Sequence, residues 1–317
     1  MKRYSILFIA WILISCNASK NLHVQNVQDK KLETGSSGMA QVNDNTYLAV
    51  YDLKNFQKGY RLGLISSYAD SITVVPIKVE NWVSEGGIPS DLEAISVIPD
   101  RPYEFLMTES GNWQGNLGRI FHIKLNIISR SAEVLGVFQL PMIHKNDIGL
   151  TGDQYEGIAC VKNDDGAYQV ILAERGGSSA YPNGLLKWAN IDFTTHQINF
   201  SEQGKTGIPV AAPGEWSNAS SKRDLTDLYI DKNGELWAAA SQDLGDSGPF
   251  NSIIYKVGNT NSSNNAPFTV FGTLEVYKSL SGYKIEALSG PSIAAPASKF
   301  TFGTEDEIYG GTWRPIE

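Results

Sequence analysis

The sequence repeats one pattern five times: a short apolar strand that begins at an acidic or small polar residue, a turn, and a second apolar strand. The copies begin at residues 37, 93, 156, 227 and 286, which are 56, 63, 71 and 59 residues apart. Their second strands read TYLAVYD, YEFLMTES, YQVILAER, ELWAAASQ and KFTFGTED. A unit of this length that recurs along a chain indicates a repeat architecture, in which neighbouring units bury one another's apolar faces.

Turn residues separate the two strands of each copy at matching places, such as Asp164-Asp165-Gly166 and Asn233-Gly234. Asp-Gly and Asn-Gly between alternating apolar runs favour β-hairpins. Two more strand-like runs follow each of the middle hairpins. Four strands per copy predict an all-β fold, a five-bladed β-propeller with its blades arranged radially around a channel. A six-bladed ring and a β-sandwich with accidental similarity between strands are the alternatives.

The last copy supplies only three obvious strands and ends in IYGGTWRPI. The N-terminal run near Leu22 to Val27 is therefore expected to add the fourth strand of the last blade. A strand in that place closes the ring and removes a free sheet edge.

The N-terminus has the features of a targeting segment. Lys2 and Arg3 precede a short apolar run, Ile6 to Ile14, which is well below the roughly 20 residues that span a bilayer as a helix. The run ends in Leu13-Ile14-Ser15-Cys16, which resembles the bacterial lipobox, where the cysteine is lipidated. An ordinary signal peptide that happens to contain a cysteine is the alternative.

Three segments follow from these features: a signal peptide over 1–15, a lipidated Cys16 with a tether over 16–34, and the propeller over 35–317. A lipidated Cys16 would hold the domain at a membrane surface of the bacterial cell envelope, outside the cytoplasm. It would also leave Cys160 without a disulfide partner. The net charge of −8 argues against nucleic acid as a partner. We also expect the protein to be a monomer.

The repeated acidic residues are the candidate functional site. If the first strand of each copy lines the channel, its first residues converge on one mouth; they are Ser37, Glu93, Glu156, Asp227 and Glu286. The second strands return to the same face, and their ends carry Asp52, Glu109, Glu174, Asp243, Glu305 and Asp306. Clustered carboxylates repel one another unless a cation compensates them, and Ca²⁺ accepts six to eight oxygen ligands. The sequence therefore predicts a calcium-type ion in the channel. The alternative is that some acids are protonated or point to solvent.

The same segments carry a family resemblance. The five repeated segments resemble the esterase-like-phytase propellers. In chain order they read SGM, LEAI with TESGNW, YEGI with AERGG, TDLYID with AASQD, and IEAL with GTEDE. It is also similar to the five-bladed calcium-activated nucleotidases (apyrases), in which a Ser, Glu, Glu, Ser, Glu series surrounds calcium. That similarity implies calcium ligands at Ser37, Glu93, Glu156 and Glu286, while the fourth position falls on Asp227 or Thr226.

Both families imply hydrolysis of phosphoesters or phosphoanhydrides in a small phosphorylated molecule. A bound cation could polarise the phosphoryl oxygen, with Glu109, Glu174 or Asp306 positioning the attacking water. Arg175 could bind a phosphate oxygen, or it could form a salt bridge to neighbouring acids. The alternative function is a non-catalytic surface lipoprotein that binds a ligand or a protein.

Overall fold

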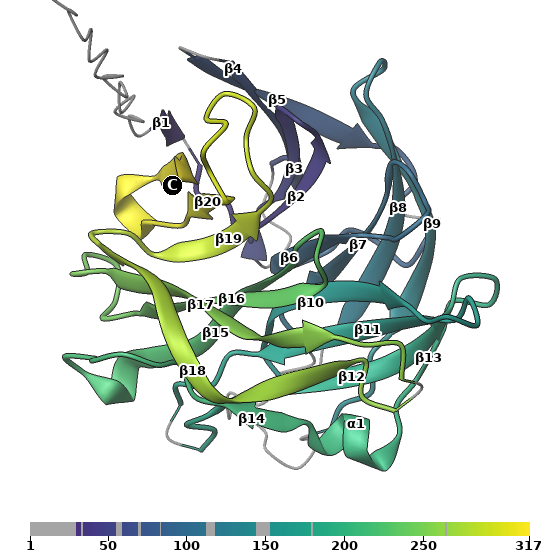
Figure 1. The fold of residues 1–317 in the computed structure, drawn as a ribbon. Coiled ribbons are helices and arrows are strands. Elements are labelled where there is room, and N and C mark those ends of the chain that lie inside the picture. The colour runs from purple at the N-terminus through teal and green to yellow at the C-terminus, as the bar shows by residue number, and fades with distance from the viewer. Residues whose placement is uncertain are drawn as a thin grey trace, which may run out of the picture.

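A computed structural model describes residues 30–32, 34–54, 59–68, 71–82, 84–111, 118–143, 153–178, 180–263 and 265–317. The predicted all-β propeller is confirmed: its blades are radially arranged antiparallel sheets, which Figure 1 shows around a common centre. The helical elements described are short, namely α1 (Glu202–Thr206), η2 (Ala219–Ser221) and η3 (Glu307–Tyr309). Among the described residues there is no helix long and apolar enough to cross a membrane.

Blades 1 and 2 form one continuous sheet. Blade 1 consists of β2 (Gly38–Asn43), β3 (Thr46–Val50), β4 (Leu62–Tyr68) and β5 (Ser71–Val79). Blade 2 consists of β6 (Leu92–Val97), β7 (Glu104–Glu109), β8 (Arg119–Asn126) and β9 (Ser131–Gln139). The two blades are joined by a parallel pairing of β5 with β9 at only two positions, Lys78 with Ser131 and Val79 with Ala132.

Blades 3 and 4 follow the same plan. Blade 3 consists of β10 (Tyr155–Lys162), β11 (Tyr168–Glu174), β12 (Gly184–Asp192) and β13 (Gln197–Asn199), with β14 (Ile208–Val210) also paired to β12. Blade 4 consists of β15 (Lys222–Ile230), β16 (Glu235–Gln242), β17 (Asn251–Thr260) and β18 (Phe268–Ser281).

Blade 5 joins the two ends of the described chain. It consists of β19 (Ile285–Ser289), β20 (Phe300–Thr304), β21 (Gly311–Ile316) and β1 (Lys30–Leu32), whose Lys30 pairs with Trp313. An N-terminal strand therefore closes the ring, as the sequence predicts, but the closing strand is Lys30–Leu32. The predicted run, Leu22 to Val27, lies outside the described residues.

The core lies between the blades. The innermost strands β2, β6, β10, β15 and β19 contact one another in that order, and β19 contacts β2, so the ring is complete. A separate cluster of buried apolar side chains fills each of the five interfaces between adjacent blades. The cluster between blades 5 and 1 contains Leu32, Tyr47 and Trp313. Burial of these faces is the main apolar stabilisation of a propeller.

The innermost strands approach one another closely near the channel. A Cβ atom on Gly38 would lie 2.8 Å from the Cα of Ala94 and 2.9 Å from the carbonyl oxygen of Glu93. A larger residue at position 38 would therefore push β2 away from β6. This close approach packs the start of β2 directly against the start of β6.

The closing strand gives a stability test. We expect Leu32→Ala to lower the free energy of unfolding by about 2–4 kcal/mol, because it leaves a cavity between blades 5 and 1. Chemical denaturation monitored by tryptophan fluorescence measures this change. Ile128→Ala is the control, since Ile128 is 97% exposed. A Leu32→Ala variant as stable as the control would show that β1 does not close the ring.

Candidate functional site

The blade topology brings many ionisable side chains to one end of the channel. In each blade the innermost strand begins, and the second strand ends, at this end; Leu92 pairs with Glu109 and Tyr155 with Glu174. We call this end the acidic mouth. Its carboxyl groups are those of Asp52, Asp91, Glu93, Glu156, Asp243, Glu286 and Glu305, which are linked by the contacts described below.

Three of these acids occupy the same special position. The strand pairing skips one residue between Leu92 and Ala94, between Tyr155 and Gly157, and between Ile285 and Ala287. The skipped residues are Glu93, Glu156 and Glu286. A residue left out of the ladder at a β-bulge can point its side chain in a new direction. The bulges thus explain why an acid followed by a small residue recurs in three blades.

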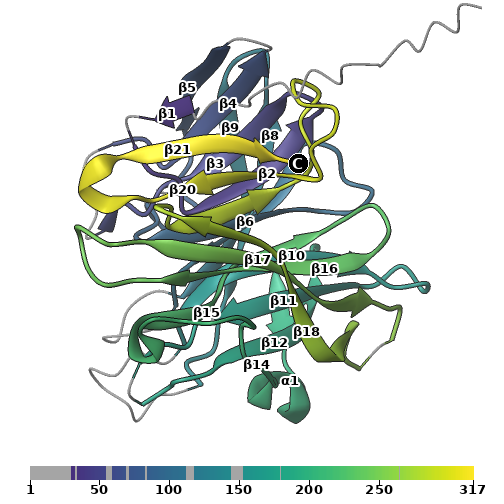
Figure 2. The ribbon, with the colours of Figure 1, turned by 60° about the vertical axis from the view of Figure 1, so that its left-hand side comes forward.

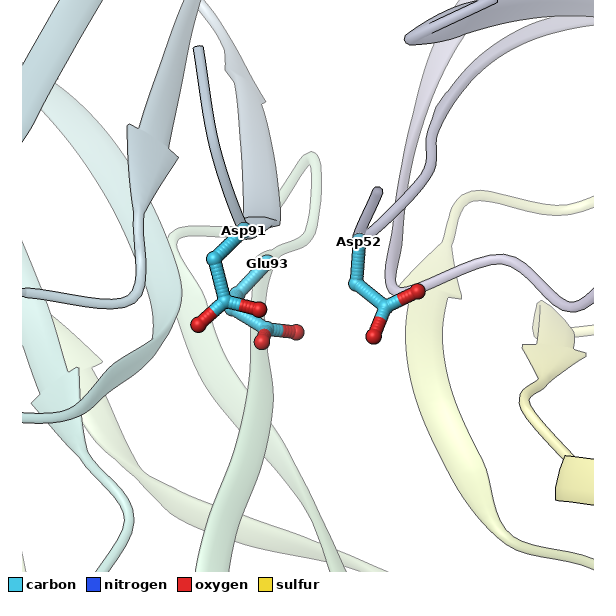
Figure 3. A group of neighbouring side chains, drawn as sticks. All are labelled: Asp52, Asp91 and Glu93. Carbon is cyan, nitrogen blue, oxygen red and sulfur yellow. The ribbon is translucent and has the colours of Figure 1, made fainter. Parts of the chain in front are cut away.

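Asp52, Asp91 and Glu93 form the tightest group, in which one carboxylate oxygen of each residue lies within 4.8 Å of the others. Figure 3 shows Asp91 beside Glu93 at the start of β6, with Asp52 facing them from the segment after β3. A side-chain hydrogen bond joins Asp91 to Glu93, so one of the two carboxyl groups carries a proton. Burial raises the pKa of Asp91 to about 6. Burial and the charges of Asp91 and Glu156 raise the pKa of Glu93 well above its ordinary value.

Lys54 supplies a positive charge to this group. Its ammonium nitrogen lies 3.0 Å from a carboxylate oxygen of Asp52 and 3.5 Å from one of Asp91. Although burial opposes it, the charges of Glu93, Asp91 and Asp52 raise the pKa of Lys54 above its ordinary value. Lys54 therefore remains protonated and forms a salt bridge with Asp52.

A second carboxyl pair lies across the mouth in blade 5. Glu286 and Glu305 are joined by a side-chain hydrogen bond, and Lys284 lies 3.0 Å from Glu286 and 3.4 Å from Glu305. Burial and the charge of Glu286 raise the pKa of Glu305 to about 11. Burial opposes ionisation of Glu286 as well, but Lys284, Glu305 and Arg223 outweigh it and lower the pKa of Glu286 to about 2. The pair therefore holds one proton, on Glu305.

Blade 4 contributes a base where an acid was expected. Arg223 lies near the start of β15, and its guanidinium contacts Asp243, Glu286 (3.5 Å) and Glu156 (4.0 Å). The charges of these acids raise the pKa of Arg223 despite its burial. Arg223 thus connects blades 3, 4 and 5 at the mouth.

The predicted blade-4 ligand, Asp227, does not belong to the mouth. It lies inside β15 opposite Ala239, whereas Lys222 and Gln242 are the pair at the mouth. Its carboxylate accepts hydrogen bonds from the backbone nitrogens of Leu228 (2.7 Å) and Leu288 (2.6 Å) and is fully buried. Burial raises the pKa of Asp227 well above its ordinary value. These contacts give Asp227 a structural position between blades 4 and 5.

The acids predicted to position water are buried in structural contacts. Glu109 is 1% exposed and pairs with Arg119 at 2.6 Å. Glu174 pairs with the buried Lys187 at 2.5 Å. Asp306 accepts hydrogen bonds from the Lys284 backbone nitrogen (2.9 Å) and the Thr304 hydroxyl (2.7 Å). A catalytic role for any of them remains a prediction that these contacts do not favour.

Strand alternation explains the placement of these residues. Glu109 and Glu174 are the last residues of their second strands and face into the blades. The residues one position later, Arg175, Asp243 and Glu305, contact groups of the acidic mouth instead. Successive side chains of a strand point to opposite faces. Arg175 makes the salt bridge considered as its alternative, 2.9 Å from Glu156.

The residues predicted to hold calcium do not form one ligand set. Asp227 is bonded to backbone nitrogens, and Glu156 and Glu286 contact arginine or lysine side chains. Ser37 is 1% exposed and donates its backbone nitrogen to Val50. The negative charge of these carboxylates, which the sequence predicted a metal ion to neutralise, is paired with basic side chains. They are Lys54, Arg175, Arg223 and Lys284. Calcium binding stays a prediction, and we derive no chemical step from it.

Two signals in the sequence mark the residues that the prediction missed. Asp91 lies two positions before Glu93, so alternation places both on the same side of the strand start. Lys284 lies two positions before Glu286 in the same way. Arg223 has no such signal, because the irregular pairing between Arg223 and Asp227 hides the register of blade 4.

Comparison with known proteins identifies no family. No family model matches the chain, and no curated protein matches it. Among solved structures, it is similar to an endo-1,4-beta-xylanase from Bacteroides thetaiotaomicron VPI-5482, with 12% identity, 90% of this chain and 91% of that chain covered, and a TM-score of 0.49. A thermostable family-43 glycoside hydrolase shares 13% identity, with 90% of this chain and 89% of that chain covered and a TM-score of 0.49. An endo-1,5-alpha-L-arabinanase from Thermotoga petrophila RKU-1 shares 11% identity, with 90% of this chain and 72% of that chain covered and a TM-score of 0.47. Likeness at this level leaves the function to be argued from the acidic mouth.

The prediction of a calcium-dependent phosphoester hydrolase is wrong. The three structures above are named for glycan hydrolysis or as glycoside hydrolases, and the resemblance to phytases and nucleotidases extends only to the propeller. The mouth also disfavours a phosphate group. Its basic side chains, Lys54, Arg175, Arg223 and Lys284, are each paired with carboxylates.

The protonated pair Asp91–Glu93 gives a test of the electrostatics. Because the pKa values of both acids are raised, the folded state binds more protons than the unfolded state as pH rises from about 4 through 6, so stability falls over this range. Glu93→Gln cannot ionise. We expect it to be more stable than the wild type at pH 8, by about 1 kcal/mol or more, with the difference shrinking below pH 4.

Urea denaturation at pH 4, 6 and 8 measures this difference. Glu133→Gln is the control, since Glu133 is an exposed acid of the same blade, on β9. A Glu93→Gln variant that is less stable than the wild type at every pH would contradict a protonated pair.

Proposed function

We propose that the protein hydrolyses glycosidic bonds at the acidic mouth, with the Asp91–Glu93 pair as proton donor and Asp52 as the ionised carboxylate. The observation that carries the proposal is the contrast within one group of three acids. Asp91 and Glu93 share a proton and have raised pKa values, whereas Asp52 lies 3.0 Å from the ammonium of Lys54. Neighbouring carboxyl groups held in opposite protonation states are the usual sign of an acid and a base or nucleophile.

Glycoside hydrolysis needs only these two kinds of group. A carboxylic acid protonates the leaving oxygen, and a carboxylate either attacks the sugar carbon or activates a water molecule. In the proposed reaction Glu93 gives its proton to the glycosidic oxygen. Burial of Glu93 and the negative charge of Asp91 keep Glu93 protonated until then. The ammonium of Lys54 lies between Asp52 and Asp91 and would hold the Asp52 carboxylate in place beside the pair.

The spacing supports a direct role for Asp52. One carboxylate oxygen of each of Asp52, Asp91 and Glu93 lies within 4.8 Å of the others, so the three groups are close together. Enzymes in which the carboxylate attacks the sugar have carboxyl groups about 5–5.5 Å apart, whereas those that place a water between them need roughly 6.5–9.5 Å. We therefore assign Asp52 as the nucleophile: it forms an ester with the sugar carbon as the glycosidic bond breaks and the leaving alcohol takes the proton of Glu93. Water, deprotonated by Glu93, then cleaves that ester, so the product is expected to retain the anomeric configuration of the substrate.

The charges around the pair favour a substrate without phosphate or other strong negative charge. Carboxyl groups outnumber basic side chains at the mouth, and Arg175 and Arg223 are already bonded to acids. A neutral sugar offers hydroxyl donors to the remaining carboxylate oxygens without adding charge. The xylanase and arabinanase named above suggest xylan and arabinan oligosaccharides as the first substrates to assay.

The proposal predicts a specific loss of activity. We expect Glu93→Gln and Asp52→Asn each to lower kcat/KM by about 100-fold or more, because each removes a group that acts on the reacting atoms. Release of reducing sugar from xylan, arabinan and galactan oligosaccharides measures the activity, with NMR of the first product for its anomeric form. Glu133→Gln is the control on the same blade.

The pH dependence follows from the same groups. Activity should persist above pH 6, where Asp91 ionises and its charge keeps the proton on Glu93, and should fall only where Glu93 itself ionises, well above the usual range of a glutamate. An EDTA arm tests the calcium prediction separately. Binding of a glycan without release of reducing sugar, or full activity in both variants, would refute the proposed hydrolysis.

The cellular setting remains a proposal. Residues 1–29, including the signal peptide and Cys16, lie outside the described residues. We propose that lipidated Cys16 holds the domain at the cell envelope outside the cytoplasm, as a monomer. Mass spectrometry of the membrane fraction tests this, since Cys16→Ser should abolish both the acyl mass and the membrane association.

A further inference from the structure

A short turn at the edge of the acidic mouth carries two exposed apolar side chains. The turn is η3, which comes shortly after Glu305 of the mouth and links β20 to β21. Figure 2 shows it as the short yellow coil between these two strands. Ile308 is 69% exposed and Tyr309 is 59% exposed. Adjacent exposed apolar side chains beside a polar site indicate a contact surface for a ligand.

Hydrogen bonds hold this turn in one conformation. The buried carboxylate of Asp306 accepts hydrogen bonds from the backbone nitrogen of Lys284 (2.9 Å) and the hydroxyl of Thr304 (2.7 Å). The backbone nitrogen of Asp306 donates to the carbonyl of Gly310 (2.8 Å), and that of Tyr309 donates to the carbonyl of Asp306 (2.9 Å). Binding a ligand on a fixed turn costs less conformational entropy than binding it on a flexible loop. The hydrogen bonds therefore favour Tyr309 as a binding residue.

The backbone of Glu307 shows that this conformation costs energy. Its φ of 48° lies in the left-handed region, which a glutamate rarely adopts. Lys284 forms an ion pair with the Glu307 carboxylate and also contacts Glu286 (3.0 Å) and Glu305 (3.4 Å) of the mouth. Strained backbone persists where the surrounding structure fixes it, and such residues cluster at binding and catalytic sites. Lys284 thus connects the turn to the acidic mouth.

We propose that Tyr309, with Ile308 beside it, is a platform for a second sugar of the glycan that is cleaved at the acidic mouth. This inference rests on the proposed hydrolysis and narrows its substrates to oligosaccharides and polysaccharides. Tyr309 follows Glu305 by four residues, so their Cα atoms lie within about 14 Å of each other. Besides burial and the charge of Glu286, the charge of Asp52 raises the pKa of Glu305, so Glu305 also lies near the proposed nucleophile. The turn is therefore close enough to contact a sugar next to the cleaved bond.

The chemistry of a neutral sugar suits this platform. The C–H groups of a sugar ring form apolar patches on its faces, while its hydroxyl groups lie around its rim. The flat ring of a tyrosine buries such an apolar patch, and its hydroxyl group remains available for a hydrogen bond. A tyrosine also loses little conformational entropy on binding, because it has few side-chain torsions to fix. The carboxyl groups of the mouth then bind sugar hydroxyls, while Tyr309 binds the apolar face of the neighbouring sugar.

Kinetics on tetrasaccharides of xylan, arabinan and galactan test the ring of Tyr309. We expect Tyr309→Ala to raise KM by about tenfold with kcat nearly unchanged, because the ring binds substrate away from the reacting atoms. Tyr309→Phe keeps the ring and should keep the wild-type KM. Tyr68→Ala is the control, since Tyr68 is 55% exposed and lies at the end of β4 far from the mouth. An unchanged KM in Tyr309→Ala, or an equal rise in Tyr309→Phe, would overturn the platform while hydrolysis itself stands.

Nitration of tyrosine gives a second readout that needs no turnover. Tetranitromethane modifies exposed tyrosine rings, and peptide mass spectrometry measures each site in the wild-type chain. We expect saturating tetrasaccharide to slow nitration of Tyr309 by about fivefold or more and to leave Tyr68 unchanged. Protection of Tyr309 without release of reducing sugar would support the platform and refute the proposed hydrolysis. No protection by any of the three tetrasaccharides would overturn the platform, whether or not they are hydrolysed.

Discussion

The pairing of β1 with β21 is the contact on which the rest of the structure depends. It brings residues 30–32 against residues 311–313 and completes the fifth blade. Once the ring is closed, each blade has a neighbour on both sides, and the apolar faces of all five interfaces are buried. Closure also fixes the distances across the channel, so the starts of the innermost strands have to meet at one mouth. The chemistry of the site is therefore a consequence of a three-residue pairing between strands at opposite ends of the described chain.

The acidic mouth shows how a fold can hold more carboxyl groups than bases. Arg223 and Lys284 keep Glu286 ionised, and Lys54 forms a salt bridge with Asp52. The remaining negative charge is avoided by protonation, with one proton between Asp91 and Glu93 and one between Glu286 and Glu305. Buried ionic groups of this kind cost desolvation energy and contribute little net stability. Their retention at one place is better explained by function than by folding.

Most of the fold could be predicted because its period is local. Apolar alternation and turn residues such as Asn233-Gly234 mark hairpins without knowledge of the partner strands, and five copies of the pattern indicate five blades. The site was predicted less well. The acids at the strand starts of blades 2, 3 and 5 were found, since Glu93, Glu156 and Glu286 follow the same local pattern. Blade 4 was misaligned, because the irregular pairing between Arg223 and Asp227 shifts the register and places Arg223 at the mouth.

The sequence by itself determined the strands, the turns, the five-fold repeat and the need for an N-terminal strand, since each depends on neighbouring residues. Only the tertiary structure decided which polar side chains face the channel. A shift of one residue turns a side chain to the other face of a strand, so Glu174 is buried against Lys187 while Arg175 reaches the mouth. The protonation states also depend on the tertiary structure. The pKa of Glu93 depends on burial and on Asp91 and Glu156, and the ring brings Glu156 beside it from another blade.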